Sequence, residues 1–157
     1  MKKLLLILII IASCILTNAQ DFKKFKENHP QYQFNPNRLD DFWHYNNNFW
    51  PVSNKENPKL YGAIDNEGEI IIPIQYQYIG KLSEGTVLAQ FKNKYGFLDK
   101  NGKKIINFKY DDAGHFIGGT VDAAKKIKKS ASESELKWFR INKYGKKVIK
   151  ENKRISY

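Results

Sequence analysis

The stretch LYGAIDNEGEIIIPIQYQYI, residues 60 to 79, returns 34 positions later as KYGFLDKNGKKIINFKYDDA, residues 94 to 113. The two copies place glycines, tyrosines and aspartates at the same offset, which chance does not produce. A partial third copy begins at Trp138-Phe139 and continues through INKYGKKVI, 43 residues after the second. A repeat of this length predicts a series of similar structural units along the chain.

The repeated positions combine aromatic residues, glycines and turn-forming acids or amides. They are Tyr61, Gly62, Asp65, Gly68, Tyr76 and Gly85 in the first copy, Tyr95, Gly96, Asp99, Gly102, Tyr110 and Gly119 in the second, and Trp138, Asn142 and Gly145 in the third. Because tyrosine and tryptophan bury a large apolar area, we expect the core to contain Tyr61, Tyr76, Tyr95, Tyr110 and Trp138.

Each copy contains one tetrad with Asp or Asn first and Gly fourth: DNEG, DKNG and NKYG. The first side chain can accept hydrogen bonds from the turn's own amides. The glycine can adopt the left-handed conformation that a side chain makes costly. Each tetrad therefore predicts a tight turn, closed by a bulge, between two strands of a β-hairpin.

Further strands are indicated around these turns. Val87, Ala89 and Phe91 recur at period two after the turn Ser83-Glu84-Gly85, which predicts a strand with one buried face. The nine additional residues of the third copy fall in KKIKKSASESELK, residues 125 to 137, and indicate a lengthened hairpin loop. The predicted fold is all-β, built from about three short tandem β-hairpin repeats.

The region before the repeats predicts a cap. Residues 20 to 27 are compatible with a helical turn, a short helix is expected near residues 38 to 46, and a short strand is expected at residues 49 to 52. Repeat arrays need such a cap at their ends. We predict a signal peptide at 1–19, a cap and linker at 20–58, the repeat domain at 59–151 and a basic tail at 152–157.

Residues 1 to 19 have the pattern of an export signal. Lys2 and Lys3 precede an apolar run that is too short to span about 30 Å of hydrocarbon, and Thr17-Asn18-Ala19 precede a cleavage point. Cys14, the only cysteine, lies in a sequence similar to a lipoprotein signal. We favour cleavage after Ala19, which leaves no cysteine for disulfides or metal binding. The expected location is periplasmic, cell-envelope or secreted.

The repeated phrase resembles the WG repeat family, whose units contain an aromatic-Gly pair, an Ile-Asp turn, an Ile-Pro strand and Ser-Glu-Gly. Here tyrosine stands for the leading tryptophan in two copies, and Phe139 stands where the third copy should have glycine. Ile72-Pro73 becomes Ile106-Asn107, and Ser83-Glu84-Gly85 becomes Ile117-Gly118-Gly119. The resemblance covers roughly residues 60 to 150. It implies a β-repeat fold and an interaction role, and it carries no catalytic residues.

The chain is strongly basic, with a formal charge of +11, or +9 without Lys2 and Lys3. This excess favours anionic partners. Export makes nucleic acid a disfavoured partner, so we consider an anionic envelope polymer or membrane surface. The lysines that we expect to contact it are Lys125, Lys126, Lys128, Lys129, Lys146, Lys147 and Lys150. The simpler interpretation, an ordinary solvated lysine surface, stays open.

Catalytic and metal-binding patterns are weak. The adjacent acids Asp40-Asp41 and Asp111-Asp112 would point to opposite faces of a strand. His29, His44 and His115 lack ligand spacing, and Gly102 lies at the wrong position for a calcium loop. We therefore expect no enzyme activity, cofactor or metal, with a small hydrolase using acidic residues as a remote alternative.

The preferred function is that of an exported, noncatalytic module that binds a protein partner through its loops. Binding of an anionic envelope polymer is the alternative. Self-association that buries an open sheet edge is also compatible with so few repeats.

Overall fold

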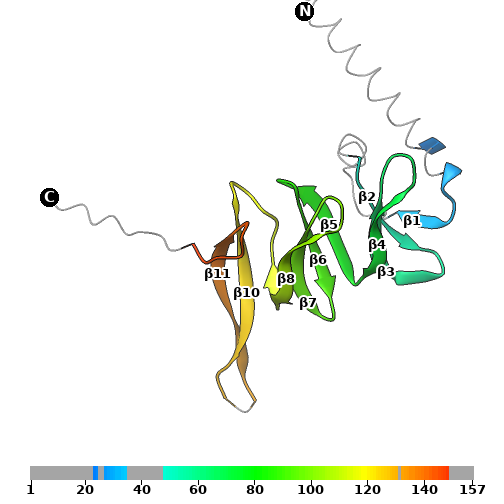
Figure 1. Ribbon diagram of the computed structural model, residues 1–157. Helices are drawn as coiled ribbons and strands as arrows, with labels where there is room; N and C mark the ends of the chain where they lie inside the picture. Colours follow the sequence, from blue (N-terminus) through cyan, green and yellow to red (C-terminus); the bar gives the residue numbers. More distant parts are fainter. Residues whose placement is uncertain (1–22, 25–26, 35–47, 131, 149–157) are drawn as a thin grey trace, which may run out of the picture. The chain divides into compact units, whose positions relative to one another are not determined.

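The structure is a computed structural model that describes residues 23–24, 27–34, 48–130 and 132–148 (Figure 1). The elements that it describes are almost entirely β-strands, which confirms the all-β prediction. The strands are β1 Tyr32–Phe34, β2 Trp50–Asn54, β3 Asn57–Ile64, β4 Ile70–Tyr76, β5 Tyr78–Ser83, β6 Thr86–Phe91, β7 Lys94–Asp99, β8 Lys104–Tyr110, β9 Asp112–Ala113, β10 Thr120–Lys128 and β11 Ser134–Asn142.

These strands form three sheets in chain order. The first has the order β1-β2-β3-β4, the second β5-β6-β7-β8, and the third β11-β10-β9. The pairs whose registers are resolved are antiparallel neighbours in sequence. The chain divides into two compact units, residues 1–74 and 75–157, so β4 runs from the first unit into the second. The second and third sheets thus belong to the same unit.

The sequence repeat and the sheets are out of phase. The copy that begins at Tyr61 starts within β3, the third strand of one sheet, and ends at Lys94, the first residue of β7 in the next sheet. Each repeat therefore contributes strands to two sheets. As a result, residues from successive copies pack together where the second and third sheets meet.

The N-terminal expectations are resolved only in part. The strand expected at residues 49 to 52 is confirmed as β2, and residues 23, 24, 27 and 28 are helical. The helix expected near residues 38 to 46, the signal segment 1–19 and the tail 152–157 lie outside the described residues. Among the helices that the structure describes, none combines the length and the apolar character needed to cross a bilayer.

The three Asp/Asn-to-Gly turns are confirmed, and they share one geometry. The Oδ1 atom of Asp99 accepts hydrogen bonds from the amides of Asn101 and Lys103, both at 2.9 Å. Asp65 and Asn142 make the corresponding two bonds, at 2.8 to 3.1 Å. The closing glycines have φ values of 88°, 82° and 71°, at Gly68, Gly102 and Gly145 respectively. Each turn is therefore set by five consecutive residues.

Gly96 is needed for another reason, because the backbones of β7 and β8 approach closely there. A Cβ atom at Gly96 would lie 2.7 Å from the carbonyl oxygen of Ile106. Gly62 has the same constraint against Ile72, at 2.4 Å. In the third copy Phe139 takes this position, and its ring packs against Tyr110 with the centroids 5.9 Å apart.

The first unit has a small core on its own sheet. Trp50, Val52 and Ile64 are buried there, and Tyr32, Phe34 and Ile74 pack against them. The rings of Phe34 and Trp50 meet edge to face at 6.2 Å, and the Trp50 indole donates to Asn66 at 2.8 Å. A buried indole with a satisfied N–H is the arrangement that stabilises such a core.

The second unit has a larger core, which lies between its two sheets. Leu88, Phe97, Ile106 and Tyr110 come from the second sheet, and Val121, Ala123 and Ile141 come from the third. Phe116, in the connection between them, packs edge to face on Phe97 at 5.0 Å. Of the three residues predicted to share one face of β6, Val87 and Ala89 are buried and Phe91 is half-buried, but Leu88 is buried on the opposite face. The reason is that the third sheet covers this opposite face.

Candidate interaction surface

The motif Ser83-Glu84-Gly85 connects the second sheet to the third. The Ser83 hydroxyl donates to the carbonyl of Phe116 at 2.8 Å. The two carboxylate oxygens of Glu84 accept from the amides of Gly118 and Gly119 at 2.6 and 2.8 Å. Gly118 and Gly119 have φ values of 61° and 74° and form the equivalent turn of the next copy. One repeat therefore holds the turn of its successor.

The apolar part of the same packing is a cross-strand pair. Leu88 of β6 lies opposite Phe97 of β7. These side chains are 4% and 0% exposed, because they face the third sheet. Tyr95 lies on the same face of β7 and is half-buried. Burial, followed by the nearby carboxylate of Asp112, raises the pKa of Tyr95 above its ordinary value.

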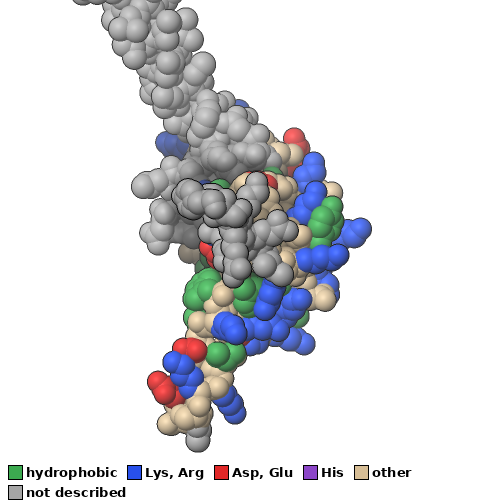
Figure 2. Space-filling view, turned by 90° about the vertical axis from the view of Figure 1, so that its left-hand side faces the viewer, with side chains coloured by type: hydrophobic (Ala, Val, Ile, Leu, Met, Phe, Trp, Pro, Cys, Tyr) green, Lys and Arg blue, Asp and Glu red, His purple; other side chains and the backbone are tan. Residues whose placement is uncertain are grey.

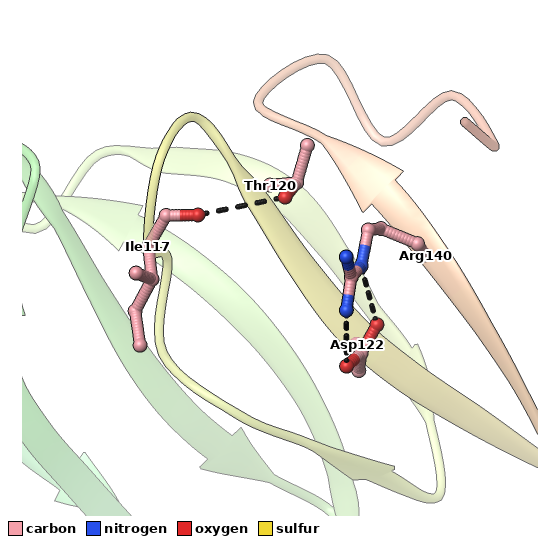
Figure 3. Close-up of polar contacts among 4 residues, drawn as sticks. All are labelled: Ile117, Thr120, Asp122 and Arg140. Carbon is pink, nitrogen blue, oxygen red and sulfur yellow. Dashed lines mark hydrogen bonds and ion pairs between the residues drawn. The ribbon is translucent and has the colours of Figure 1, made fainter. Parts of the chain in front are cut away.

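The third sheet has different residues at the matching positions. The repeat offsets relate Leu88 to Asp122 and Phe97 to Arg140, which are again cross-strand neighbours. Figure 3 shows Arg140 with its guanidinium against the Asp122 carboxylate, at 2.8 and 2.9 Å. This ion pair, chiefly by hydrogen bonding, raises the pKa of Arg140. We call the face that carries Asp122, Leu136, Trp138 and Arg140 the outer face of the third sheet.

We call Ser83 and Glu84, which bind the turn of the next copy, the clamp. Both residues are replaced on the third sheet. Ser83 corresponds to Ile117, which is 79% exposed, and Glu84 corresponds to Gly118. Ile117 and Thr120 close a two-residue turn that Figure 3 shows beside the ion pair. The groups that join the second sheet to the third therefore lack equivalents on the outer face.

The core prediction is wrong at Trp138. Tyr76 and Tyr110 are buried as expected, and Tyr61 and Tyr95 are half-buried, but Trp138 is 51% exposed. Trp138 holds the position of Tyr95 on a sheet whose outer face is not covered by another sheet within the described residues. Leu136, two residues earlier on the same face, is 43% exposed. Sequence analysis missed this apolar pair because it treated all repeated aromatics as equivalent.

The lengthened loop expected at residues 125 to 137 is corrected by the structure, since most of it is strand. The second sheet closes its hairpin directly after the pair Phe91 and Lys94. In the third sheet the equivalent pair, Lys125 and Lys137, is followed by three more pairs that end at Lys128 and Ser134. Backbone pairing between the two strands therefore continues through these residues. The added residues therefore form a two-stranded projection, visible at the lower end of Figure 1.

A cavity of about 370 Å³ lies along one side of this projection, from Lys94 and Asp111 at its base to the hairpin tip. Its lining is rich in lysine and serine: Lys94, Asp111, Lys126, Lys128, Ser130, Ser132, Glu133 and Ser134. Asp111 accepts from the backbone amide of Lys126 at 2.8 Å and pairs with the ammonium of Lys94. The hydrogen bond from Lys126, followed by that from Lys94, holds the pKa of Asp111 below its ordinary value.

The lysines proposed from the sequence have separate locations. Lys125, Lys126, Lys128 and Lys129 are exposed on the projection, and Lys129 pairs with Glu135 at 2.7 Å. Lys146 and Lys147 are exposed near the third turn, where Lys147 lies 4.5 Å from the centre of the Phe139 ring. Lys150 lies outside the described residues. Figure 2 shows Lys and Arg side chains gathered along one side of the face that it presents, beside hydrophobic side chains.

Among the described lysines of that set, Lys126 and Lys128 line the cavity, together with Lys94. Lys94 was missed because it belongs to the preceding sheet, 32 residues before Lys126 in the chain. Its place at the start of the repeated phrase carried no signal of a contact with residues so far along the sequence.

The described acidic pair, Asp111 and Asp112, does not form a convergent site. Asp111 is directed to Lys94 and Lys126, whereas the Oδ1 atom of Asp112 accepts from the amide of Ala113 at 2.8 Å. Asp40, Asp41 and His44 lie outside the described residues. His29 contacts the carbonyl of Glu67, and His115 lines a second cavity with Arg140. Within the described residues, no three His, Cys, Asp or Glu side chains are grouped as metal ligands.

The fold defines a class, an all-β repeat protein built from meandering antiparallel sheets. Residues 61–95 and 95–122 match the WG containing repeat, so the chain contains two adjacent repeats of that family. The matches do not extend over the third copy, although its turn at Asn142 has the same hydrogen bonds as the other two. No curated protein and no solved structure has a significant match to the chain.

Proposed function

We propose that this protein is an exported, noncatalytic β-repeat module that binds a partner protein through the outer face of the third sheet. The observation that carries the proposal is the 51% exposure of Trp138 at a position where the preceding sheet half-buries a tyrosine. Exposed tryptophan is costly in water and is enriched in the centres of protein interfaces. Leu136 enlarges the apolar area, and Arg140 gives it a polar border.

Export and lack of catalysis are supported by separate observations. Residues 1 to 19 have the charge and apolar pattern of a cleaved signal, with lipid attachment at Cys14 as the variant that intact mass would reveal. The adjacent acids Asp111 and Asp112 are directed to different partners, whereas a hydrolase of the glycosidase type needs two converging carboxylates.

The test compares capture of partners from envelope extract by the 20–157 chain and by its Trp138→Ala variant. Ile70→Ser, which changes an exposed apolar residue in the first unit, is the matched control. We expect Trp138→Ala to lose a specific partner that both the wild type and the control retain. Equal capture by all three chains would contradict the proposed surface. Thermal unfolding of each chain confirms that the comparison uses folded protein.

A second candidate function is binding to an anionic envelope polymer or membrane surface. It is favoured by the exposed lysines Lys125, Lys126, Lys128 and Lys129 on the projection. Binding of this kind weakens steeply with salt, because exposed charges are screened. Retention on anionic polymer or lipid that is unchanged between low and high salt would contradict this alternative.

A further inference from the structure

The outer edge of β10 is covered along only part of its length. β9 pairs with Ala123 and Ala124, whereas β10 continues to Lys128. In the second sheet the corresponding edge strand, β5, runs alongside β6 from Tyr78 to Ser83. The extension of β10 beyond β9 therefore creates a length of strand edge that has no counterpart in the second sheet.

The hydrogen bonds show which backbone groups point toward this edge. The carbonyls of Asp122 and Ala124 accept from the amides of Gly114 and Asp111 at 3.0 and 2.9 Å. The amide of Lys126 donates on the same side to Asp111. Because these directions alternate along an antiparallel strand, the carbonyl of Lys126 and both backbone polar groups of Lys128 also point there. In the described part of the chain, no strand pairs with them.

The side chains beside this edge select for negative charge. The cavity along the side of the projection is lined by three lysines, Lys94, Lys126 and Lys128, and by serines. One of its two acids, Asp111, is already paired with Lys94. The bond from the Lys126 amide to Asp111 also shows that this edge accommodates a carboxylate. An extended segment rich in Glu or Asp matches both the backbone groups and the lysines.

We propose that an acidic, extended segment of the partner protein adds as a strand along β10, continuing the line of β9, with its carboxylates on Lys126 and Lys128. This inference rests on the proposed function and names the chemistry of its partner. A second copy of this chain is disfavoured, because the approaching edge would have the same lysines. A polysaccharide could satisfy the lysines, but it has no regular backbone ladder to match the strand edge.

The experiment uses the 20–157 chain and a library of capped nonapeptides in which Glu alternates with Val, Ile, Thr or Tyr. A matched library has Lys in place of Glu. The best acidic peptide is then made with N-methyl groups on alternate residues, which keep the charge and remove the ladder hydrogen bonds. We expect preferential binding of acidic peptides and about tenfold or greater weakening on N-methylation. Equal binding of the two libraries, or no loss on N-methylation, would overturn the proposal.

Protein variants provide the second measurement. Lys126→Gln with Lys128→Gln is expected to weaken the acidic peptide about fivefold, since each exposed ion pair contributes modestly. Lys143→Gln with Lys146→Gln makes the same charge change at exposed positions away from the cavity and is expected to have little effect. Equal effects of the two double variants, or equally tight binding of a polygalacturonate fragment, would show that charge alone explains the binding and would overturn strand addition.

The two proposals fail in different ways. If Trp138→Ala leaves partner capture unchanged while the peptide results are as expected, the outer face is not the binding surface. Strand addition along β10 is then still supported. If Trp138→Ala abolishes capture but the acidic peptides do not bind, the partner is held by the outer face without strand addition.

Discussion

Arg140 and Asp122 form a two-point ion pair across β10 and β11, at the positions where Phe97 and Leu88 form an apolar pair in the preceding sheet. The apolar pair packs on the next sheet, and the ion pair stays in contact with water. One repeated backbone register thus supports either a sheet-to-sheet contact or a terminal face, depending on two side chains.

An apolar pair on the outer face of the third sheet should make copies of the protein associate through that face. We expect Asp122→Leu with Arg140→Phe to increase the apparent mass in light scattering as protein concentration rises, because the added area joins Trp138 and Leu136. The reversed pair, Asp122→Arg with Arg140→Asp, keeps the charges and should behave as the wild type. An apolar double variant with unchanged mass at every concentration would argue against this explanation.

The Glu84 clamp should contribute to the stability of the second unit. Glu84→Ala removes the acceptor of two amide hydrogen bonds, from Gly118 and Gly119, and should lower the free energy of unfolding by about 1–2 kcal/mol in urea titration. Glu67→Ala, at an exposed turn position, is the control and should change it by less than about 0.5 kcal/mol. Equal losses in both variants would contradict the clamp.

Close approach of two backbones should make Gly96 intolerant of any side chain. Gly96→Ala places a Cβ atom 2.7 Å from the Ile106 carbonyl oxygen, so β7 and β8 must separate locally. We expect a loss of about 2 kcal/mol or more in the free energy of unfolding. Gly114→Ala is the control, because its nearest neighbour would be 3.8 Å away. The idea fails if the two alanine variants are equally stable.

Tyr110 and Trp138 both hold repeated aromatic positions, but they differ in exposure, so replacing each with alanine should change the free energy of unfolding by different amounts. Tyr110 is buried in the shared core, and we expect Tyr110→Ala to cost about 3 kcal/mol or more. Trp138 is half exposed, and Trp138→Ala should cost about 1 kcal/mol or less. Chemical denaturation of both variants tests this difference. A larger loss for Trp138→Ala would place that side chain in the folding core.

Asp111 should make the projection sensitive to acid. Its pKa is lowered by the Lys126 amide and by Lys94, so its carboxylate stabilises the folded state above the ordinary aspartate range. This contribution is lost as the pH falls through the lowered pKa. Wild type should therefore exceed Asp111→Asn in free energy of unfolding at pH 7, and the difference should shrink at pH 2. A difference independent of pH would contradict this assignment.

Local features of the fold could be predicted because they depend on neighbours in the sequence. The Asp99 turn is stabilised by hydrogen bonds to residues two and four positions later and by a glycine with positive φ. The same pattern recurs at Asp65 and Asn142, so the hairpins followed directly from the quoted phrases. The repeat offset also predicted an all-β architecture, since every copy specifies the same strands.

Contacts between sheets were decided by the tertiary structure alone. Glu84 binds amides 34 and 35 residues later, and Lys94 meets Asp111 beside the projection. The same aromatic position is half-buried at Tyr95 and exposed at Trp138, because one sheet is covered and the other is not. The repeat therefore determined which strands and turns form, since those depend on short-range hydrogen bonds. Which side chains meet a partner depends on long-range packing, which periodicity along the chain does not encode.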